Sequence, residues 1–238
     1  MNFRAWSGGD DLRRQKVIWR TGRSVGLAAL CGALASCQTA PLQTTIFRRD
    51  FTPDNVFVYP PKLSLDFRRV VVLPIAPAVA AQDLPEGCEA LAPVLWEQIV
   101  KTKRFEAVAV DAAGLRLRTG RAAWTGQEVL PADFFAYLRR EYDCDGVLFA
   151  ELTSYRAYAP LAVGWRFKLV DARTGQVIWS ADELFDAARP EVQQAARHFD
   201  QPKPVLPFIS ANDWAGLNSP SQFGRYSAAA LLQTLPER

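Results

Sequence analysis

The feature that most constrains the fold is a pair of alternating segments joined by a short turn. Residues 163–169 read Val-Gly-Trp-Arg-Phe-Lys-Leu, so large apolar residues alternate with glycine or a charged residue. A strand with this pattern buries one face and exposes the other. The turn at residues 171–176 leads into a second apolar segment, residues 177–185, which we expect to pair with the first in an antiparallel direction. With a strand at 146–155, these segments predict an antiparallel C-terminal meander.

The preceding part of the chain predicts strands that alternate with helices. Residues 68–75 contain the β-branched run Val-Val-Val and read as a strand covered on both faces. We expect a helix over residues 89–103, with Pro93 in its first turn, where proline is tolerated. A second strand is expected over residues 105–110, because its apolar side chains alternate.

Three further helices complete the expected order. Residues 131–142 predict a helix with Pro131 at its first position, whereas residues 111–128 favour neither helix nor strand. Residues 190–199 have a helical pattern, and Ser219-Pro-Ser-Gln resembles a capping box that opens the last helix. The order β-α-β-α-β-β-β-α-α predicts an α/β fold of the α+β type, in which helices pack on a mixed sheet.

Charge and histidine content argue against several functions. The whole chain has 28 cations and 25 anions, of which residues 1–36 hold six cations and two anions, leaving 22 and 23 in the rest. The body therefore lacks the positive surface of a nucleic-acid-binding protein. A single histidine, His198, excludes a multi-histidine metal site and most histidine-based triads. Asp143 and Asp145 could be read as an acid/base pair or as cation ligands, but they flank a turn, where aspartate is common. We expect no catalytic residue, no metal and no cofactor.

The N-terminus has the pattern of an export signal. Residues 24–36 carry no charge and follow a basic stretch that ends in Arg20 and Arg23. A span needs about 20 apolar residues, so this run is too short and instead indicates a secretory signal peptide. It ends in Leu34, Ala35, Ser36 and Cys37, which resemble a bacterial lipobox. The resemblance implies cleavage between Ser36 and Cys37, a diacylglycerol on the Cys37 thiol, and an N-acyl chain such as palmitate on the new amino terminus.

The residue after the cysteine suggests a location. Gln38, rather than aspartate, follows Cys37, and in the usual sorting pattern of such lipoproteins this implies the periplasmic face of the outer membrane of a Gram-negative bacterium.

Two alternatives to this reading of the N-terminus stay open: an uncleaved membrane segment in which Cys37 is merely a small residue, and translation from Val17. The predicted organisation is a signal peptide over 1–36, a lipidated tether over 37–66 that contains a short edge strand near Val56, and one periplasmic domain over 67–238.

Two segments resemble a known group of lipoproteins. Residues 142–151 read Tyr-Asp-Cys-Asp-Gly-Val-Leu-Phe-Ala-Glu, and residues 169–179 read Leu-Val-Asp-Ala-Arg-Thr-Gly-Gln-Val-Ile-Trp. Together with the run at 70–75, they resemble the periplasmic domain shared by the curli secretion lipoprotein, the Pel polysaccharide export lipoprotein and the lipoprotein activators of penicillin-binding proteins. The similarity covers about residues 66–186. It implies a non-enzymatic scaffold or accessory component of an envelope export or cell-wall machine, with an envelope protein or further copies of the chain as partner.

Two cysteines remain after the predicted processing. Cys88 and Cys144 form an even pair, and an oxidising periplasm favours a disulfide between them. However, Cys88 follows the first strand and Cys144 precedes the third. If these strands are parallel, the two residues lie at opposite ends of the sheet, beyond the limit of about 7 Å between bridged Cα atoms. The alternative is two buried free thiols.

Aromatic residues concentrate in the meander and allow two interpretations. Trp165 and Phe167 share a face, with Trp179 across from them, which is typical of core packing. Alternatively, Tyr155, Tyr158 and Trp165 contact a partner, with Tyr158 at an exposed strand-to-strand bend. The second interpretation supports another function, the binding of a soluble envelope ligand such as a glycan. A hydrolase that uses the carboxylates around the meander is a third hypothesis.

Overall fold

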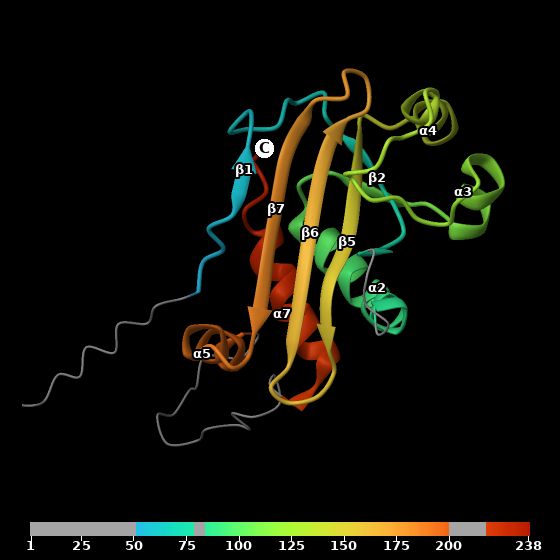
Figure 1. Cartoon of the computed structure of the whole chain (residues 1–238). Coiled ribbons are helices and arrows are strands. Elements are labelled where there is room, and N and C mark those ends of the chain that lie inside the picture. Colours follow the sequence, from blue (N-terminus) through green and yellow to red (C-terminus); the bar gives the residue numbers. More distant parts are fainter. Residues whose placement is uncertain (1–50, 79–83, 200–217) are drawn as a thin grey trace, which may run out of the picture. The chain divides into compact units, whose positions relative to one another are not determined.

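The computed structural model describes residues 51–78, 84–199 and 218–238 (Figure 1). All of these residues belong to one unit of the chain, Arg48–Arg238. They form a seven-stranded open sheet in the order β1-β7-β6-β5-β2-β4, with β3 pairing to β5. The mixed sheet with packed helices confirms the predicted fold class. The signal peptide and the first part of the predicted tether lie outside the described residues.

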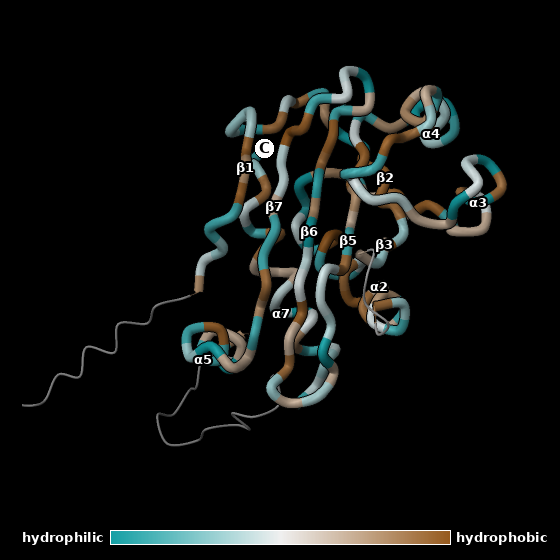
Figure 2. Tube along the Cα trace, viewed as in Figure 1, coloured by the Kyte–Doolittle hydropathy of each residue, from teal (hydrophilic) through white to brown (hydrophobic). Residues whose placement is uncertain are grey.

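The sheet has an antiparallel half and a parallel half that meet at β5. The predicted meander is confirmed as three long strands: β5 (Gly146–Arg156), β6 (Ala162–Asp171) and β7 (Val177–Asp186). The antiparallel edge is β1 (Val56–Val58), which pairs with β7. The parallel half consists of β2 (Arg69–Val72), β3 (Ala76–Pro77) and β4 (Glu106–Ala109). Figure 2 shows hydrophobic and hydrophilic residues following one another along β6 and β7, as the alternation requires.

Helices cover the two faces of the sheet unequally. One face is covered by α2 (Leu84–Thr102) and α7 (Pro220–Leu232), with α5 (Pro190–His198) against β7 and α7 (Figure 1). The other face carries α3 (Ala112–Thr119) and α4 (Phe134–Tyr142), whose buried side chains pack on β2 and β5. The antiparallel strands β6 and β7 are therefore covered mainly on the side of α2 and α7.

The larger core is organised around a row of stacked aromatic rings. Trp165 stacks on Phe167 with ring centroids 5.3 Å apart, and Phe167 stacks on Trp179 at 6.0 Å. The indole N–H of Trp165 donates to the Ser227 hydroxyl at 2.9 Å, and that of Trp179 donates to the Thr234 hydroxyl at 3.0 Å. These bonds matter because an indole N–H that is buried without a partner costs free energy. The core-packing interpretation of these aromatic residues is confirmed.

The structure corrects the start of α2. This helix begins at Leu84 rather than near Glu89, so Pro93 lies inside it and Pro85 takes the place in the first turn. A proline inside a helix removes one backbone hydrogen bond, to the carbonyl four residues earlier. The buried face of α2, which includes Leu91 and Leu95, outweighs this loss because tertiary packing overrides local propensity.

The region that favoured neither helix nor strand contains a short helix, α3. Asp111 caps its start, since its carboxylate accepts a hydrogen bond from the Gly114 amide at 2.8 Å. Gly120 ends it in the left-handed conformation, with φ of 81°.

The starts of two other helices test the sequence predictions. The helix α4 begins at Phe134, and Pro131 lies in the preceding turn, where the Pro131 carbonyl accepts a hydrogen bond from the Phe134 amide. The predicted cap of α7 is confirmed, because Ser219 accepts a hydrogen bond from the Gln222 amide.

A glycine allows α7 to approach α2 closely, and this yields a stability prediction. A Cβ on Gly224 would collide with the side chain of Leu91, which is fully buried, so Leu91 or the helix would have to shift. We expect Gly224→Ala to lower the free energy of unfolding by about 1–3 kcal/mol, although alanine is the better helix former. Chemical denaturation measures the change.

Gly114→Ala in α3 is the matched control. A Cβ there meets only the Asp111 carboxylate at 3.6 Å, an ordinary contact. We expect the free energy of unfolding to stay the same or to rise by about 0.5–1 kcal/mol. Equal effects of the two substitutions would contradict the close approach of the two helices.

Candidate partner-binding surface

The residues predicted to contact a partner differ in exposure. Tyr158 lies in the loop between β5 and β6 and is 83% exposed, as expected for the bend. Tyr155 is half-buried and packs against the larger core. Trp165 is fully buried, so its prediction as a partner contact is wrong. The alternation of β6 places Trp165 on the face that α7 covers, where Ser227 binds its indole N–H.

The opposite face of β1, β7 and β6 carries two exposed apolar side chains among half-buried polar ones. The register places Phe57 beside Ser180, and Ser180 beside Lys168. Along the same strands, Arg166 pairs with Asp182 and Gly164 pairs with Leu184. These residues point away from the aromatic row, because each neighbours a member of that row or of the larger core along its strand. We call this surface the open face; it consists of Phe57, Arg166, Lys168, Ser180, Asp182 and Leu184.

A row of charges crosses the open face on three adjacent strands. Arg166 on β6 contacts Asp182 on β7 at 2.7 Å and Glu151 on β5 at 3.1 Å. Burial alone would lower the pKa of Arg166, but the hydrogen bond to Asp182 and the charges of both carboxylates outweigh it and raise that pKa. Glu151 is buried, so its charge is held by this arginine. The row is a paired cross-strand network that helps to fix the strand register.

Exposed apolar side chains flank this charged row. Phe57 is 51% exposed and Leu184 is 46% exposed, one on each side of the row. Lys168 limits the face toward α4, because its ammonium group donates to the carbonyl of Gly126 in the preceding loop. These two side chains are the large apolar groups that this face exposes, so they are its candidate contact points for another protein. The sequence predicted the edge strand that carries Phe57. It did not predict which face of the sheet Phe57 lies on, because the pairing of β1 with β7 decides that.

The two acidic residues next to Cys144 have structural roles. The Asp145 carboxylate accepts hydrogen bonds from the backbone amides of Arg68 at 2.8 Å and Arg69 at 3.1 Å. Asp143 ends α4 in the left-handed conformation and is fully exposed. His198 is also exposed. Within the described part of the chain, no group of three or more His, Cys, Asp or Glu residues is arranged to hold a metal ion.

The cysteines are free thiols in separate cores. Cys88 belongs to the core beneath α2 and α7, whereas Cys144 belongs to the core beneath α3 and α4. The structure thus corrects the disulfide alternative, because the sheet itself separates the two residues. Burial raises the pKa of each thiol to about 11, with the charge of Glu89 adding to the effect at Cys88.

These thiols are expected to be unreactive in the folded protein. With a pKa of about 11, only about one thiol in a thousand is ionised at pH 8, and the thiolate is the reactive form. We expect iodoacetamide at pH 8 to leave Cys88 and Cys144 unmodified until denaturant is added. Mass spectrometry of the peptides that contain them measures the modification, and rapid labelling of the native protein would contradict the expectation.

The predicted lipidation residues, Leu34, Ala35, Ser36 and Cys37, lie outside the described residues. Among the residues that the structure does describe, none of the helices has the length and apolar character needed to cross a membrane.

Comparisons with known proteins found similarity only at the level of structure. No known protein-family model matches the sequence, and no curated protein matches it. Among solved structures, the PelC dodecamer from Paraburkholderia phytofirmans is similar at 15% identity and a TM-score of 0.44, over 77% of this chain and 98% of that chain. Lipoprotein GNA1162 from Neisseria meningitidis matches at 19% identity and a TM-score of 0.32, over 50% of this chain and 79% of its own.

A third similar structure is the LpoB C-terminal domain from Salmonella enterica, at 17% identity and a TM-score of 0.30, over 50% of this chain and 82% of that domain. PelC and LpoB are thus among the solved structures to which the chain is similar, and they match the resemblance that the sequence shows. Identities this low carry no activity, ligand or partner over to this chain.

Proposed function

We propose that the chain is a lipid-anchored accessory protein at the periplasmic face of the outer membrane, without enzymatic activity, which binds an envelope protein or further copies of itself through the open face. The observation that carries the proposal is the sequence Leu34-Ala-Ser-Cys37 directly after the short uncharged run. These residue types suit lipidation, since a small residue fits the peptidase site and the cysteine thiol accepts the lipid. Several acyl chains, at about 0.8 kcal/mol for each buried CH₂, make a durable anchor.

The open face supports a protein partner. Phe57 and Leu184 present apolar area on a sheet surface that no described helix covers, and the outer edge of β1 pairs with no other described strand. An unpaired strand edge beside exposed apolar side chains is suited to contact with another polypeptide. The charges between Phe57 and Leu184 are already paired with one another, through one arginine and two carboxylates, so they would orient such a contact more than strengthen it.

The anchor predicts a clear effect of one substitution. We expect wild-type protein to partition with membranes and to carry the added mass of acyl chains, whereas Cys37→Ala carries none, because the acceptor thiol is lost. Intact-mass spectrometry of detergent-extracted protein, together with fractionation, measures both properties. Cys31→Ala is the matched control, since this cysteine lies within the uncharged run and is expected to leave acylation unchanged. Acylation of Cys37→Ala, or its absence from the wild type, would refute the anchor.

The open face predicts a separate effect. We expect Leu184→Lys, alone or with Phe57→Ser, to weaken self-association or partner binding at least about tenfold, because a charge then enters the apolar contact. The melting temperature should change little, since both side chains are about half exposed. Sedimentation velocity over a concentration series and crosslinking in membranes measure the effect.

Leu117→Lys is the control for this experiment. Leu117 is 90% exposed on α3, away from the open face, so its substitution is expected to leave association unchanged. Equal association by wild type, Leu184→Lys and Leu117→Lys would refute the open face as the contact surface and leave the anchor prediction unaffected.

A further inference from the structure

The described chain joins the sheet at one particular end. Phe51 packs edge-to-face on Phe185 of β7, with ring centroids 5.4 Å apart, and the Arg189 guanidinium lies over the Phe51 ring. From there the chain runs antiparallel to β7 until Val58 pairs with Trp179. Phe185 is the last residue but one of β7, so Phe51 lies at the end of the sheet where β7 stops.

The loop between β5 and β6 lies at this same end. Arg156, the last residue of β5, pairs with Ala162, the first residue of β6, and Ala162 also pairs with the last residue of β7, Asp186. We call this end of the sheet the loop end (Figure 1). The opposite end, which we call the turn end, holds Asp171 and Val177 on either side of the turn between β6 and β7.

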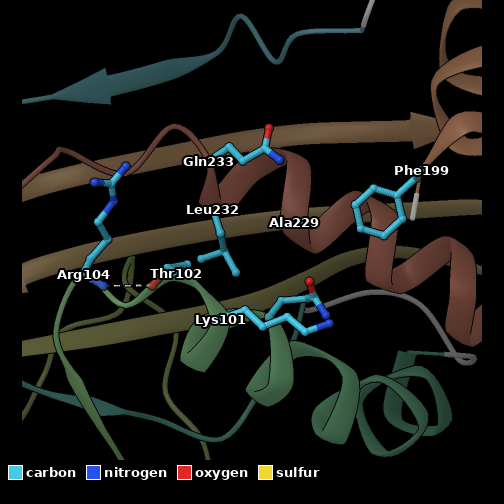
Figure 3. Close-up of a pocket in the computed structure, with 8 residues that line it drawn as sticks. Lys101, Thr102, Arg104, Phe199, Ala229, Leu232 and Gln233 are labelled. Carbon is cyan, nitrogen blue, oxygen red and sulfur yellow. Dashed lines mark hydrogen bonds between the residues drawn. The ribbon is translucent and has the colours of Figure 1, made fainter. Parts of the chain in front are cut away.

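The helix α2 runs from the loop end toward the turn end. Gly87, in its first turn, lies against the ring of Tyr155 near the end of β5. The helix has 19 residues, so it rises about 28 Å before the chain enters β4. The last turns of α2 and α7 line a pocket of about 370 Å³, which Figure 3 shows with Arg104 at one end. This pocket therefore lies away from the β5–β6 loop.

The tip of the β5–β6 loop is uncharged and exposed. Residues 158–160 read Tyr-Ala-Pro, all three are exposed, and Tyr158 is 83% exposed. The charged residue nearest to the tip in sequence, Arg156, is engaged at the base of the loop. Its guanidinium donates to the Pro160 carbonyl and contacts the Asp186 carboxylate at 2.9 Å. The loop is thus held at its base and presents an aromatic ring, while its own charge is paired.

The length of chain before Phe51 limits how far the domain can lie from a lipid anchor. Thirteen residues, 38–50, separate Cys37 from Phe51. A chain of this length spans at most about 50 Å, and a random coil of this length averages about 20 Å. β7 is 10 residues long and spans about 30 Å. The loop end therefore reaches the membrane at the average length, whereas the turn end requires the chain to stretch back along the sheet.

Exposure of a tyrosine does not by itself distinguish the two ends. Tyr59 is 66% exposed and lies at the turn end, where its amide donates to the Ile178 carbonyl. The two tyrosines differ in which end of the sheet they share with Phe51. A short link raises the effective concentration of lipid around the loop end to the millimolar range, so even a weak contact there is populated. Tyrosine favours the headgroup level of a bilayer, where its ring is buried and its hydroxyl stays in water.

We infer that the β5–β6 loop contacts the lipid surface and that the Tyr158 ring inserts at the headgroup level. The inference rests on the proposed anchor at Cys37, because the anchor brings the membrane to the loop end. The loop end then faces the membrane, and the turn end faces away from it. The open face extends between the two ends, so it stays accessible to a protein partner.

Fluorescence quenching in vesicles tests the contact. Lipidated protein with Tyr158→Cys or Tyr59→Cys is labelled with the fluorophore NBD and placed in vesicles of phosphatidylethanolamine and phosphatidylglycerol that contain a lipid with a nitroxide headgroup. The native Cys88 and Cys144 are buried and are expected to stay unlabelled. We expect the nitroxide to quench the label at position 158 at least about threefold more than the label at position 59, which is the matched control.

A second set of variants isolates the Tyr158 side chain. The label is placed through Ala159→Cys, and either Tyr158→Asp or Tyr158→Phe is added. The aspartate should reduce the quenching at least about threefold, because a carboxylate is unfavourable below the headgroups, whereas the phenylalanine should keep it. Both variants should retain the wild-type melting temperature, since Tyr158 is 83% exposed.

Equal quenching at positions 158 and 59, or equal quenching with Tyr158→Asp and Tyr158→Phe, would overturn the inference. Intact-mass spectrometry of the same samples separates this failure from failure of the proposed function. Protein that carries acyl chains but shows no quenching at position 158 refutes the lipid contact alone. Protein without acyl chains refutes the anchor, and the lipid contact with it.

Discussion

The stacked row of Trp165, Phe167 and Trp179 is the interaction on which the rest of the structure depends. It fills the space between the meander and α7, and the hydroxyls of Ser227 and Thr234 satisfy its two indole N–H groups. Because the row commits one face of β6 and β7 to the interior, the residues between its members must face outward. The open face is a direct consequence of this packing.

The pairing of α2 with α7 has a comparable consequence on the other side of the sheet. Gly224 allows the two helices to touch at Leu91, and their last turns line the pocket that contains Gln98 and Arg104. Two surfaces of different chemistry thus result from one core: a sheet surface on which exposed apolar side chains flank paired charges, and a small pocket between two helices.

Local sequence patterns predicted much of the fold. They failed where contacts between distant parts of the chain determine the bounds of an element. The alternation of residues 163–169 predicted a buried face, and Ser219 predicted the cap of α7, because both signals act within a few residues. The place of Pro93 was wrong, since the buried face of α2 extends the helix back to Leu84 despite a lost hydrogen bond. The helix α3 was missed, although Asp111 and Gly120 carry its start and stop signals.

The sequence by itself determined which residues share a face of the meander and where a lipid is expected, because strand periodicity and the residues up to Cys37 are properties of neighbouring positions. Only the tertiary structure decided which face is covered. That choice buries Trp165, separates Cys88 from Cys144 across the sheet, and leaves Phe57 and Leu184 exposed. The physical reason is that exposure depends on which helices pack on a strand, and α2 and α7 lie far from β6 in the chain.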